Sequence, residues 1–318
     1  MKKLLSTISN YNQPVESFKV HILGCGSALP TMRHFPSSQV IELRDKLFMV
    51  DCGEGTQLQM RRCKVKFNKL GHVFISHLHG DHCFGLIGMI STLGLLGRIA
   101  DLHVYADKTL EPVLKILLDT FCTDLGFKVV FHAIDASVRQ VIYDDRSLTV
   151  ETIPLVHRIP TCGFLFCEKP MLPHIRRDMI DMYGIPVSQI MNIKNGKNWM
   201  TQNGEVVPNC RLVTPSEPPR SYAYCSDTRY LPEMCEQLQG VDTLYHESTY
   251  GEDNLLMAKK YNHATARQAA LIARQAGAKK LILGHFSSRY DDENVLLNEA
   301  REVFENVFLA NELDIFDV

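Results

Sequence analysis

The sequence predicts an α/β fold, and two observations support this prediction. Apolar runs of strand length alternate with segments of helical periodicity through much of the 318-residue chain. His and Asp residues directly follow several of the apolar runs. In α/β proteins, functional side chains gather at the carboxyl ends of the strands, so this placement fits the same class.

The expected strands are short apolar runs bounded by turn-forming residues: 19–23, 40–41, 47–50, 72–76, 102–105, 129–132, 148–153, 164–167, 222–225, 243–245 and 281–283. The expected helices have apolar residues at helical spacing: 83–96, 108–121, 265–275 and 293–304. The helix at 265–275 is the clearest of these, because it is rich in Ala and Gly277 follows its end.

Residues 168–220 differ in composition from the rest of the chain. They hold 7 of the 14 prolines, 5 of the 12 methionines and the sole tryptophan, Trp199. The stretch from Asn195 to Gly204 is typical of a hairpin tip. One interpretation is a long surface loop. The other is a partly ordered functional excursion from a single domain spanning 1–318, because long excursions from compact folds usually serve function.

Charge and composition limit the function classes. The 34 Lys and Arg against 36 Asp and Glu give a net charge of −2, which argues against non-specific nucleic-acid binding but permits a local basic patch. The ten cysteines include no C-x-x-C pair, so we expect reduced thiols. The apolar part of the N-terminus is too short for a signal peptide, and the longest uncharged run, 83–97, is too short for a membrane span. These features predict a cytoplasmic protein.

The strongest chemical signal is His77-Leu-His79-Gly-Asp81-His82, which directly follows an apolar run. On an extended segment, residues i and i+2 share a face, so His77 and His79 are expected to bind one ion together. Asp81 and His82 follow a glycine at the start of the next helix and are expected to point toward a second ion. Three His and one Asp within six residues predict a metal site.

The same arrangement recurs along the chain. His157, Asp227, His246 and His285 each lie just past an apolar run. We therefore expect one joint site with two overlapping ligand sets, one of His77, His79, His157 and Asp227, the other of Asp81, His82, Asp227 and His285. Asp227 bridges the two ions in this arrangement. Nitrogen-rich ligation without thiolate favours Zn²⁺, with Mn²⁺ or Fe²⁺ as alternatives.

These motifs resemble a known family. His77-Leu-His-Gly-Asp-His82 is the signature of the metallo-β-lactamase superfamily, and further motifs resemble the ribonuclease Z family of tRNA 3′-processing endonucleases. The motifs that carry this second resemblance are Leu23-Gly-Cys-Gly-Ser-Ala-Leu-Pro-Thr31, Asp51-Cys-Gly-Glu-Gly-Thr-Gln57, Ser226-Asp-Thr-Arg229, His246-Glu-Ser-Thr249 and Gly284-His-Phe-Ser-Ser-Arg-Tyr290.

The resemblance implies a four-layer αββα sandwich, two Zn²⁺ ions per subunit, a homodimer, and a flexible arm at 168–220 that binds precursor tRNA. The sequence departs from the family pattern at Ser226, where the family usually has Gly, and at Ser248, where it usually has Ala. It also lacks the second Gly-Pro of bacterial arms.

The resemblance also implies a mechanism. A hydroxide bridging the two metal ions attacks the phosphodiester and leaves a tRNA 3′-hydroxyl. Asp81 is implied to be both ligand and proton acceptor, and His246, oriented by Glu247, to stabilise or protonate the leaving oxygen. The position of His263, just before the 265–275 helix, fits a supporting role behind the ligands, contact with a substrate phosphate, or a helix cap. The residues expected to contact substrate are Thr249, Arg229, Arg289, Lys194 and Lys197.

Two other functions also fit these residues. A phosphodiesterase of the same fold that acts on small phosphodiesters shares the metal centre but has no use for the arm. A non-catalytic metal-binding or RNA-binding scaffold needs neither Asp81 as a base nor a complete ligand set.

Overall fold

The computed structural model describes residues 17–318. The prediction that the N-terminus is not a signal peptide concerns residues outside this range. Within 17–318, no helix combines the length and apolar character needed to cross a bilayer.

One sheet contains seven strands in the order β18-β1-β2-β3-β4-β5-β6. These are β1 (Phe18–Gly24), β2 (Ser38–Leu43), β3 (Lys46–Cys52), β4 (Leu70–Phe74), β5 (Leu102–Asp107), β6 (Val129–Ile134) and β18 (Ile315–Asp317). Strands β3 to β6 are parallel, whereas β18, β1, β2 and β3 pair in antiparallel fashion.

The other large sheet has the order β17-β16-β15-β14-β9-β8-β7. Its strands are β7 (Val141–Asp144), β8 (Leu148–Pro154), β9 (Cys162–Glu168), β14 (Ser221–Cys225), β15 (Thr243–Glu247), β16 (Lys280–Gly284) and β17 (Val307–Leu309). Strands β14 to β17 are parallel, so their carboxyl ends meet at one edge.

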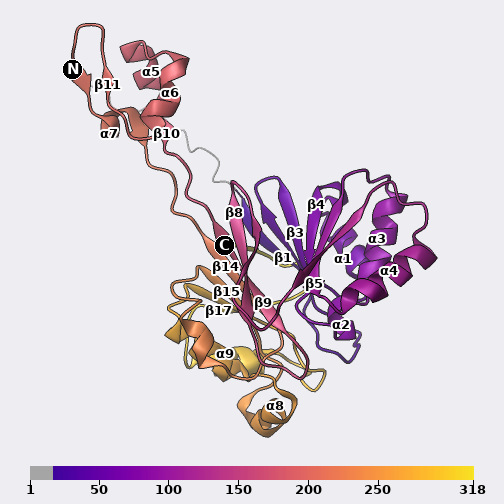
Figure 1. The fold of residues 1–318 in the computed structure, drawn as a ribbon. Coiled ribbons are helices and arrows are strands. Elements are labelled where there is room, and N and C mark those ends of the chain that lie inside the picture. Colours follow the sequence, from indigo (N-terminus) through magenta and orange to yellow (C-terminus); the bar gives the residue numbers. More distant parts are fainter. Residues whose placement is uncertain (1–16) are drawn as a thin grey trace, which may run out of the picture.

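Helices cover the outer face of each sheet (Figure 1). On the first sheet these are α1 (Thr56–Arg62), α2 (Gly80–Cys83), α3 (Leu86–Leu95) and α4 (Leu110–Phe121), and on the second α9 (Ala266–Gln275) and α10 (Asn294–Arg301). Helix α8 (Leu255–Tyr261) and short 3-10 turns at Phe67–Lys69, Pro232–Cys235 and Glu252–Asn254 lie in the connections. The α/β class and the αββα layering predicted from the sequence are confirmed.

Successive residues of a strand point to opposite faces of its sheet, so each strand contributes apolar side chains both to the core between the sheets and to a core under the helices. Phe74 on β4 contacts Phe164 on β9 with ring centroids 5.5 Å apart, so the inner faces of the two sheets pack directly on each other. The residues that alternate with this inner set, such as Val73 and Ile75, pack under α3 instead.

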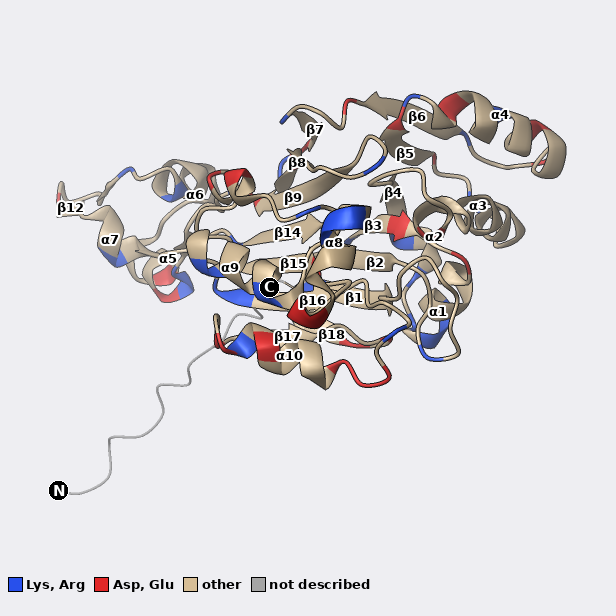
Figure 2. Cartoon of the chain, turned by 90° about the horizontal axis from the view of Figure 1, so that it is seen from below, with Lys and Arg blue, Asp and Glu red and all other residues tan. Residues whose placement is uncertain are grey.

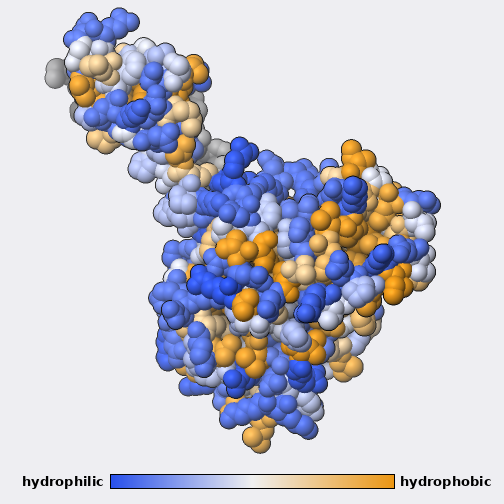
Figure 3. Space-filling view, in the orientation of Figure 1, coloured by the Kyte–Doolittle hydropathy of each residue, from blue (hydrophilic) through white to orange (hydrophobic). Residues whose placement is uncertain are grey.

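Residues 169–220, called the arm below, form a small folded unit between β9 and β14. Its elements are β10 (His174–Ile175), α5 (Arg177–Tyr183), α6 (Val187–Lys194), β11 (Trp199–Met200), β12 (Val206–Val207), α7 (Asn209–Leu212) and β13 (Val213–Thr214). It has its own apolar cluster around Ile185, Ile193, Val207 and Leu212. Figure 3 shows it as a lobe standing away from the body. The interpretation as a plain surface loop is therefore wrong.

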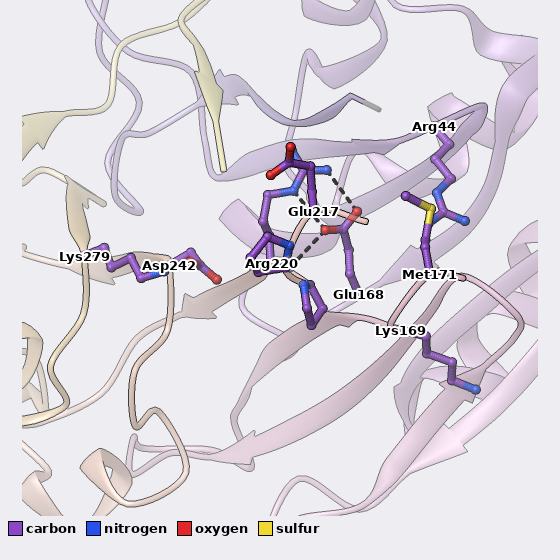
Figure 4. Close-up of a pocket in the computed structure, with 10 residues that line it drawn as sticks. Arg44, Glu168, Lys169, Met171, Glu217, Arg220, Asp242 and Lys279 are labelled. Carbon is purple, nitrogen blue, oxygen red and sulfur yellow. Dashed lines mark hydrogen bonds and ion pairs between the residues drawn. The ribbon is translucent and has the colours of Figure 1, made fainter. Parts of the chain in front are cut away.

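An ion pair joins the two chain segments at the base of the arm, where β9 ends and β14 begins. The Nε atom of Arg220 donates to Oε2 of Glu168 at 2.9 Å, and its Nη2 atom donates to Oε1 at 2.9 Å (Figure 4). The main-chain N–H of Arg220 also donates to Oε2 of Glu168 at 2.9 Å. A two-pronged contact between guanidinium and carboxylate fixes the relative geometry of both groups, so the arm leaves the body through one clamped stem.

Candidate metal centre

The predicted ligands converge at the carboxyl ends of the strands. His77 and His79 lie in the segment between β4 and α2, and His157, Asp227 and His285 follow β8, β14 and β16. Because the two sheets face each other, the loops that follow β4 and β14 meet at the same end of the sandwich. The structure thus brings together residues that are up to 208 positions apart in the sequence, from His77 to His285.

The first donor set consists of His77, His79, His157 and Asp227. The Nε2 atom of His77 lies 3.1 Å from Nδ1 of His79. The Asp227 Oδ2 atom lies 3.6 Å from His77 Nε2 and 3.8 Å from His157 Nε2. Four nitrogen and oxygen atoms therefore surround one point.

The second donor set consists of Asp81, His82 and His285, with Asp227 between the two sets. The Oδ2 atom of Asp81 lies 3.4 Å from Nε2 of both His82 and His285. The Oδ1 atom of Asp227 lies 3.5 Å from His82 Nε2 and 3.1 Å from His285 Nε2. The two oxygens of Asp227 thus face different donor sets, an arrangement that a bridging carboxylate requires.

The residues fit a pair of Zn²⁺ ions. Tetrahedral zinc with bonds of about 2.0–2.1 Å separates neighbouring donor atoms by about 3.3–3.4 Å, close to the separations seen here. Moreover, His82 Nε2, His157 Nε2 and Asp227 Oδ1 are buried and have no hydrogen-bond partner among residues 17–318. Buried polar atoms without partners are costly, so bound cations that engage these atoms are expected, one at each donor set.

The ionisation of the ligands also favours bound cations. Burial lowers the pKa of His77, His79 and His157, which keeps these rings in the neutral form that binds metal. At His82, burial opposes protonation, but the charges of Asp227, Asp51 and Asp81 raise the pKa well above the usual range. The field of three carboxylates therefore attracts positive charge to this point.

Asp51 supports the second donor set and was not assigned a role from the sequence. Its carboxylate is fully buried and accepts hydrogen bonds from His82 Nδ1 (2.7 Å) and from the hydroxyl of Tyr224 (2.6 Å). It also accepts from the main-chain N–H (2.8 Å) and hydroxyl (2.9 Å) of Ser76. A carboxylate behind a ligating histidine fixes the tautomer and direction of its ring, so Asp51 positions His82.

A second chain of hydrogen bonds runs behind His285. Its Nδ1 atom lies 2.8 Å from Oγ1 of Thr249, which donates to Oε2 of Glu247 at 2.6 Å. The other carboxylate oxygen, Oε1, accepts from His263 Nδ1 at 2.8 Å and from the main-chain N–H of Thr228 at 2.9 Å. His263 itself stacks on His285 with centroids 5.5 Å apart, so Glu247 and His263 lie directly beside the donor sets.

Strained backbone occurs at this centre. Asp51, Asn262 and His285, with φ between 56° and 60°, are three of the six non-glycine residues of positive φ in 17–318. Asn262 belongs to the centre because its carbonyl accepts a hydrogen bond from Nδ1 of the ligand His157 at 2.9 Å. A left-handed residue that is not glycine costs about 1–2 kcal/mol, and such residues gather where function imposes their geometry.

Comparison with known proteins places the chain in a family. A family model described as anti-Pycsar protein Apyc1 matches residues 18–172, which is less than half of the chain. Over 298 residues, the chain is 59% identical to a ribonuclease Z of Bacteroides fragilis, covering 94% of this chain and 98% of that protein. The chain belongs to the ribonuclease Z family.

Further similarities agree with this membership. A ribonuclease Z of Phocaeicola vulgatus is 58% identical and is covered over 96% of its length. The crystal structure of the short form of human tRNase Z superposes with a TM-score of 0.70 at 24% identity, covering 94% of this chain and 99% of that one, which shows a shared fold. The prediction that the chain is a ribonuclease Z enzyme is confirmed by the relatives that span it almost completely.

Within this ribonuclease Z family member, His246 does not occupy the position predicted from the sequence. Its ring is fully buried, its Nδ1 donates to the main-chain carbonyl of Glu247 at 2.7 Å, and its Nε2 has no hydrogen-bond partner within 17–318. Neighbouring residues on a strand point to opposite faces, so β15 can direct only one of the pair into the site. The Glu247 carboxylate orients His263 rather than His246, and this corrects the predicted pairing.

The residues predicted to contact substrate are scattered. Thr249 is 2% exposed and its hydroxyl is engaged by Glu247 and His285, so it orients a ligand instead of contacting phosphate. Arg229 and Arg289 are exposed near the ligands that they follow in sequence. Lys194 and Lys197 lie in the arm, outside the metal centre.

A basic cluster beside the centre was not predicted from the sequence. Exposed Lys259 and Lys260 lie in the last turn of helix α8, and Lys260 Nζ lies 5.2 Å from the centroid of the Tyr261 ring. The guanidinium of Arg158, which follows His157, lies 5.9 Å from the same ring. Figure 2 shows this blue stretch on α8. The signal was available in the sequence, because both segments adjoin His157 or His263.

Proposed function

We propose that this protein is a zinc-dependent endoribonuclease that removes the 3′ trailer from precursor tRNA. The observation that carries the proposal is the pair of donor sets that share Asp227, in a chain that belongs to the ribonuclease Z family over almost its whole length. The products are a tRNA with a 3′-hydroxyl and a trailer with a 5′-phosphate.

In this proposal, His77, His79, His157 and Asp227 hold one Zn²⁺, and Asp81, His82, His285 and Asp227 hold the other. Mn²⁺ or Fe²⁺ would suit the same nitrogen and oxygen donors. When bound, the two ions supply a water of lowered pKa and neutralise charge on the phosphate during its substitution.

The chain's own residues handle the protons. Asp81 presents a carboxylate at the rim of the second donor set and accepts the proton of the attacking water. His263 donates a proton to the 3′ oxygen as its bond to phosphorus breaks. Burial opposes protonation of His263, but the adjacent Glu247 carboxylate raises its pKa to about 9, so the ring is held in its acidic form. Bound cations would oppose this rise, because they repel the proton on the ring.

The basic cluster beside the centre supports a polyanionic substrate. Arg158, Lys259 and Lys260 line the same side as His157 and His263 and are expected to contact phosphates next to the scissile bond. They provide a local positive field, although the net charge of the whole chain is −2. Arg229 and Arg289 remain expected phosphate contacts.

The arm is proposed to hold the body of the tRNA. Its exposed basic residues include Arg177, Lys197 and Arg211, and Figure 2 shows blue segments on α5, α6 and α7. The arm leaves the body at the Glu168 end of β9, next to the start of β14, whereas Asp227 follows the end of β14. Arm and metal centre therefore lie at opposite ends of the sandwich (Figure 1).

A homodimer would allow the arm and the distant metal centre to act on the same tRNA molecule. If the arm of one subunit reaches the tRNA bound at the metal centre of its partner, both features serve one cleavage event. The homodimer and the cytoplasmic location stay predictions.

The decisive experiment incubates the purified protein with a precursor tRNA that carries a 3′ trailer, with and without a chelator, and maps the cut. We expect cleavage after the last nucleotide kept in the mature tRNA, abolished by chelator and restored by Zn²⁺. Cleavage at scattered positions, or cleavage unaffected by chelator, would contradict the proposal.

The alternative, a phosphodiesterase specific for small substrates, is not favoured, because the relatives named ribonuclease Z match through the arm as well as the body. The structure allows a clean test. The hydroxyl of Ser216 donates to the carbonyl of Met171 at 2.8 Å, so the two ends of the arm are adjacent. Replacing 172–215 by two glycines should abolish cleavage of precursor tRNA and spare a chromogenic phosphodiester. Unchanged cleavage of precursor tRNA would refute the role of the arm.

A further inference from the structure

A second cluster of metal-binding side chains lies outside the centre described above. It consists of Cys25, which follows β1, His34 in the loop before β2, and Glu312 in the segment between β17 and β18. The three donor atoms face one another. Cys25 Sγ lies 3.3 Å from His34 Nδ1 and 3.6 Å from Glu312 Oε1, and His34 Nδ1 lies 3.0 Å from Glu312 Oε2.

We propose that Cys25, His34 and Glu312 form a third metal site, which binds one Zn²⁺ and ties the C-terminal segment to the loop beside the catalytic centre. Zinc with a Zn–S bond of about 2.3 Å and Zn–N or Zn–O bonds of about 2.0–2.2 Å separates its donors by about 3.3–3.6 Å. The distances from Cys25 Sγ to His34 Nδ1 (3.3 Å) and to Glu312 Oε1 (3.6 Å) fall within this range, and the distance from His34 Nδ1 to the other carboxylate oxygen, Oε2, is slightly shorter at 3.0 Å. The fourth position falls to water or to the carbonyl of Ala310, which lies 3.3 Å from Cys25 Sγ.

The residues around the cluster are arranged as the outer shell of a metal site. The second ring nitrogen of His34, Nε2, lies 3.3 Å from Oε1 of Glu293. Ligating histidines usually donate their other N–H to a carboxylate in this way. The Oε1 atom of Glu312 accepts from the main-chain N–H of Phe35 at 2.8 Å, which leaves Oε2 toward His34. Each of these two ligands is thus held by a partner of its own.

The donor types limit the ion. A thiolate, an imidazole and a carboxylate together suit Zn²⁺, whereas Mg²⁺ and Ca²⁺ prefer oxygen ligands alone. Binding converts the Cys25 thiol to a thiolate and releases its proton to solvent. Cys25 is fully buried and two carboxylates lie within the cluster or against it, so only a bound cation makes the thiolate stable there.

The site would reinforce the catalytic centre from behind. The main-chain N–H of Phe286 donates to the carbonyl of Cys25 at 2.9 Å, and Phe286 directly follows the ligand His285. The Phe286 ring also lies 5.8 Å from the ring of His34. A metal at Cys25 therefore fixes the loop that carries one ligand of the second donor set.

Cobalt spectroscopy tests the site independently of activity. Neither catalytic donor set contains a cysteine, so a thiolate-to-Co²⁺ charge-transfer band in the near ultraviolet reports on a site of this kind. Protein produced in cobalt-supplemented, zinc-depleted medium should show this band. Cys25→Ser and His34→Gln should lose it, whereas Cys167→Ser, which removes a half-buried thiol on β9, should retain it.

Native mass spectrometry of the zinc protein gives the second measurement. We expect three Zn²⁺ ions per chain for the wild type and Cys167→Ser, and two for Cys25→Ser. Two ions per wild-type chain, or a cobalt band that persists in Cys25→Ser, would overturn the proposal. The cluster would then be a hydrogen-bonded clasp in which a protonated His34 lies between Glu312 and Glu293. Because the wild-type count and spectrum need no variant, a misfolded mutant does not obscure the result.

Discussion

Replacing Asp51 with Asn tests whether a residue that touches no substrate controls metal binding. The two side chains have the same shape, but Asp51 accepts four hydrogen bonds, one at Oδ1 and three at Oδ2. An amide offers one acceptor oxygen and an NH₂ group that can only donate. Whichever way the amide of the variant is oriented, its NH₂ group faces at least one donor in a fully buried position.

The cost follows from these contacts. A buried polar group left without a partner costs about 1–3 kcal/mol, so we expect the free energy of unfolding to fall by about that amount. Loss of a carboxylate behind a ligating histidine typically weakens metal binding about 10–100-fold, or about 1.4–2.8 kcal/mol. We therefore expect Asp51→Asn to bind the ion held by His82 about 10–100-fold more weakly than the wild type.

Competition with a chromogenic chelator measures this affinity, and chemical denaturation measures the stability. Asp145→Asn is the matched control. Asp145 accepts hydrogen bonds from the main-chain N–H groups of Ser147 (2.7 Å) and Leu148 (3.0 Å), far from the metal centre. It should lose stability and keep wild-type metal affinity. If Asp51→Asn loses stability but binds zinc within about threefold of the wild type, the assignment of Asp51 as a positioning residue is refuted.

Three further predictions follow from the structure. Glu247→Gln removes the charge paired with His263 and should lower kcat on precursor tRNA about 10²-fold. Hydrolysis of a 4-nitrophenyl phosphodiester should change far less, because that leaving group needs no proton. Equal losses on both substrates would exclude the acid role. Mixing arm-deleted subunits with Asp81→Ala subunits should restore cleavage if each arm serves the partner's centre, and two inactive proteins that stay inactive on mixing would contradict this arrangement. Burial, with a smaller contribution from His103 and His132, lowers the pKa of His72 to about 4. Between about pH 6.5 and pH 4 the unfolded chain therefore binds more protons than the folded protein, which destabilises the folded protein as the pH falls. The difference in free energy of unfolding between wild type and His72→Gln, measured by denaturation at several pH values, should thus shrink from about pH 7 to about pH 4.

The fold could be predicted from sequence where the local pattern and the tertiary structure agree. The apolar runs that became β1, β5, β8 and β14 are buried on both faces or alternate cleanly, so their positions were correct within a few residues. Strands β7 and β17 were missed because several of their residues are exposed or only half-buried and their apolar runs are short. Their existence depends on pairing with β8 and β16, which local sequence does not reveal.

The predicted helix at 83–96 shows the same limit. The structure interrupts it between α2 and α3, where a side chain on Gly85 would lie 2.0 Å from the carbonyl oxygen of Gly53. The main-chain N–H of Gly85 also donates to the carbonyl of Cys52 at 2.8 Å. This close approach to the loop after β3 ends one helix and starts the next, and periodicity alone cannot detect it.

At the site, the convergence of the His and Asp residues was predictable, because each follows a strand and belongs to a residue type that binds metal. The supporting residues were not. Asp51 reaches His82 across 31 positions, and His263 reaches Glu247 across 16. The choice between His246 and Glu247 depends on which face of β15 is turned toward the site, and a fully buried strand has no polar alternation that would reveal it.

The distribution of the ligands between the two sheets has a thermodynamic consequence. Each ion would take two ligands from the β1–β6 half of the sandwich (His77 and His79, or Asp81 and His82) and two from the β7–β17 half (His157 and Asp227, or Asp227 and His285). Neither half would bind an ion fully by itself, so the metals would act as cross-links between the sheets. At free metal concentrations about 100 times the Kd, each bound ion would add about 2.7 kcal/mol to the stability of the folded state. The supply of metal in the cell would then shift the equilibrium between folded and unfolded protein as well as the rate of catalysis.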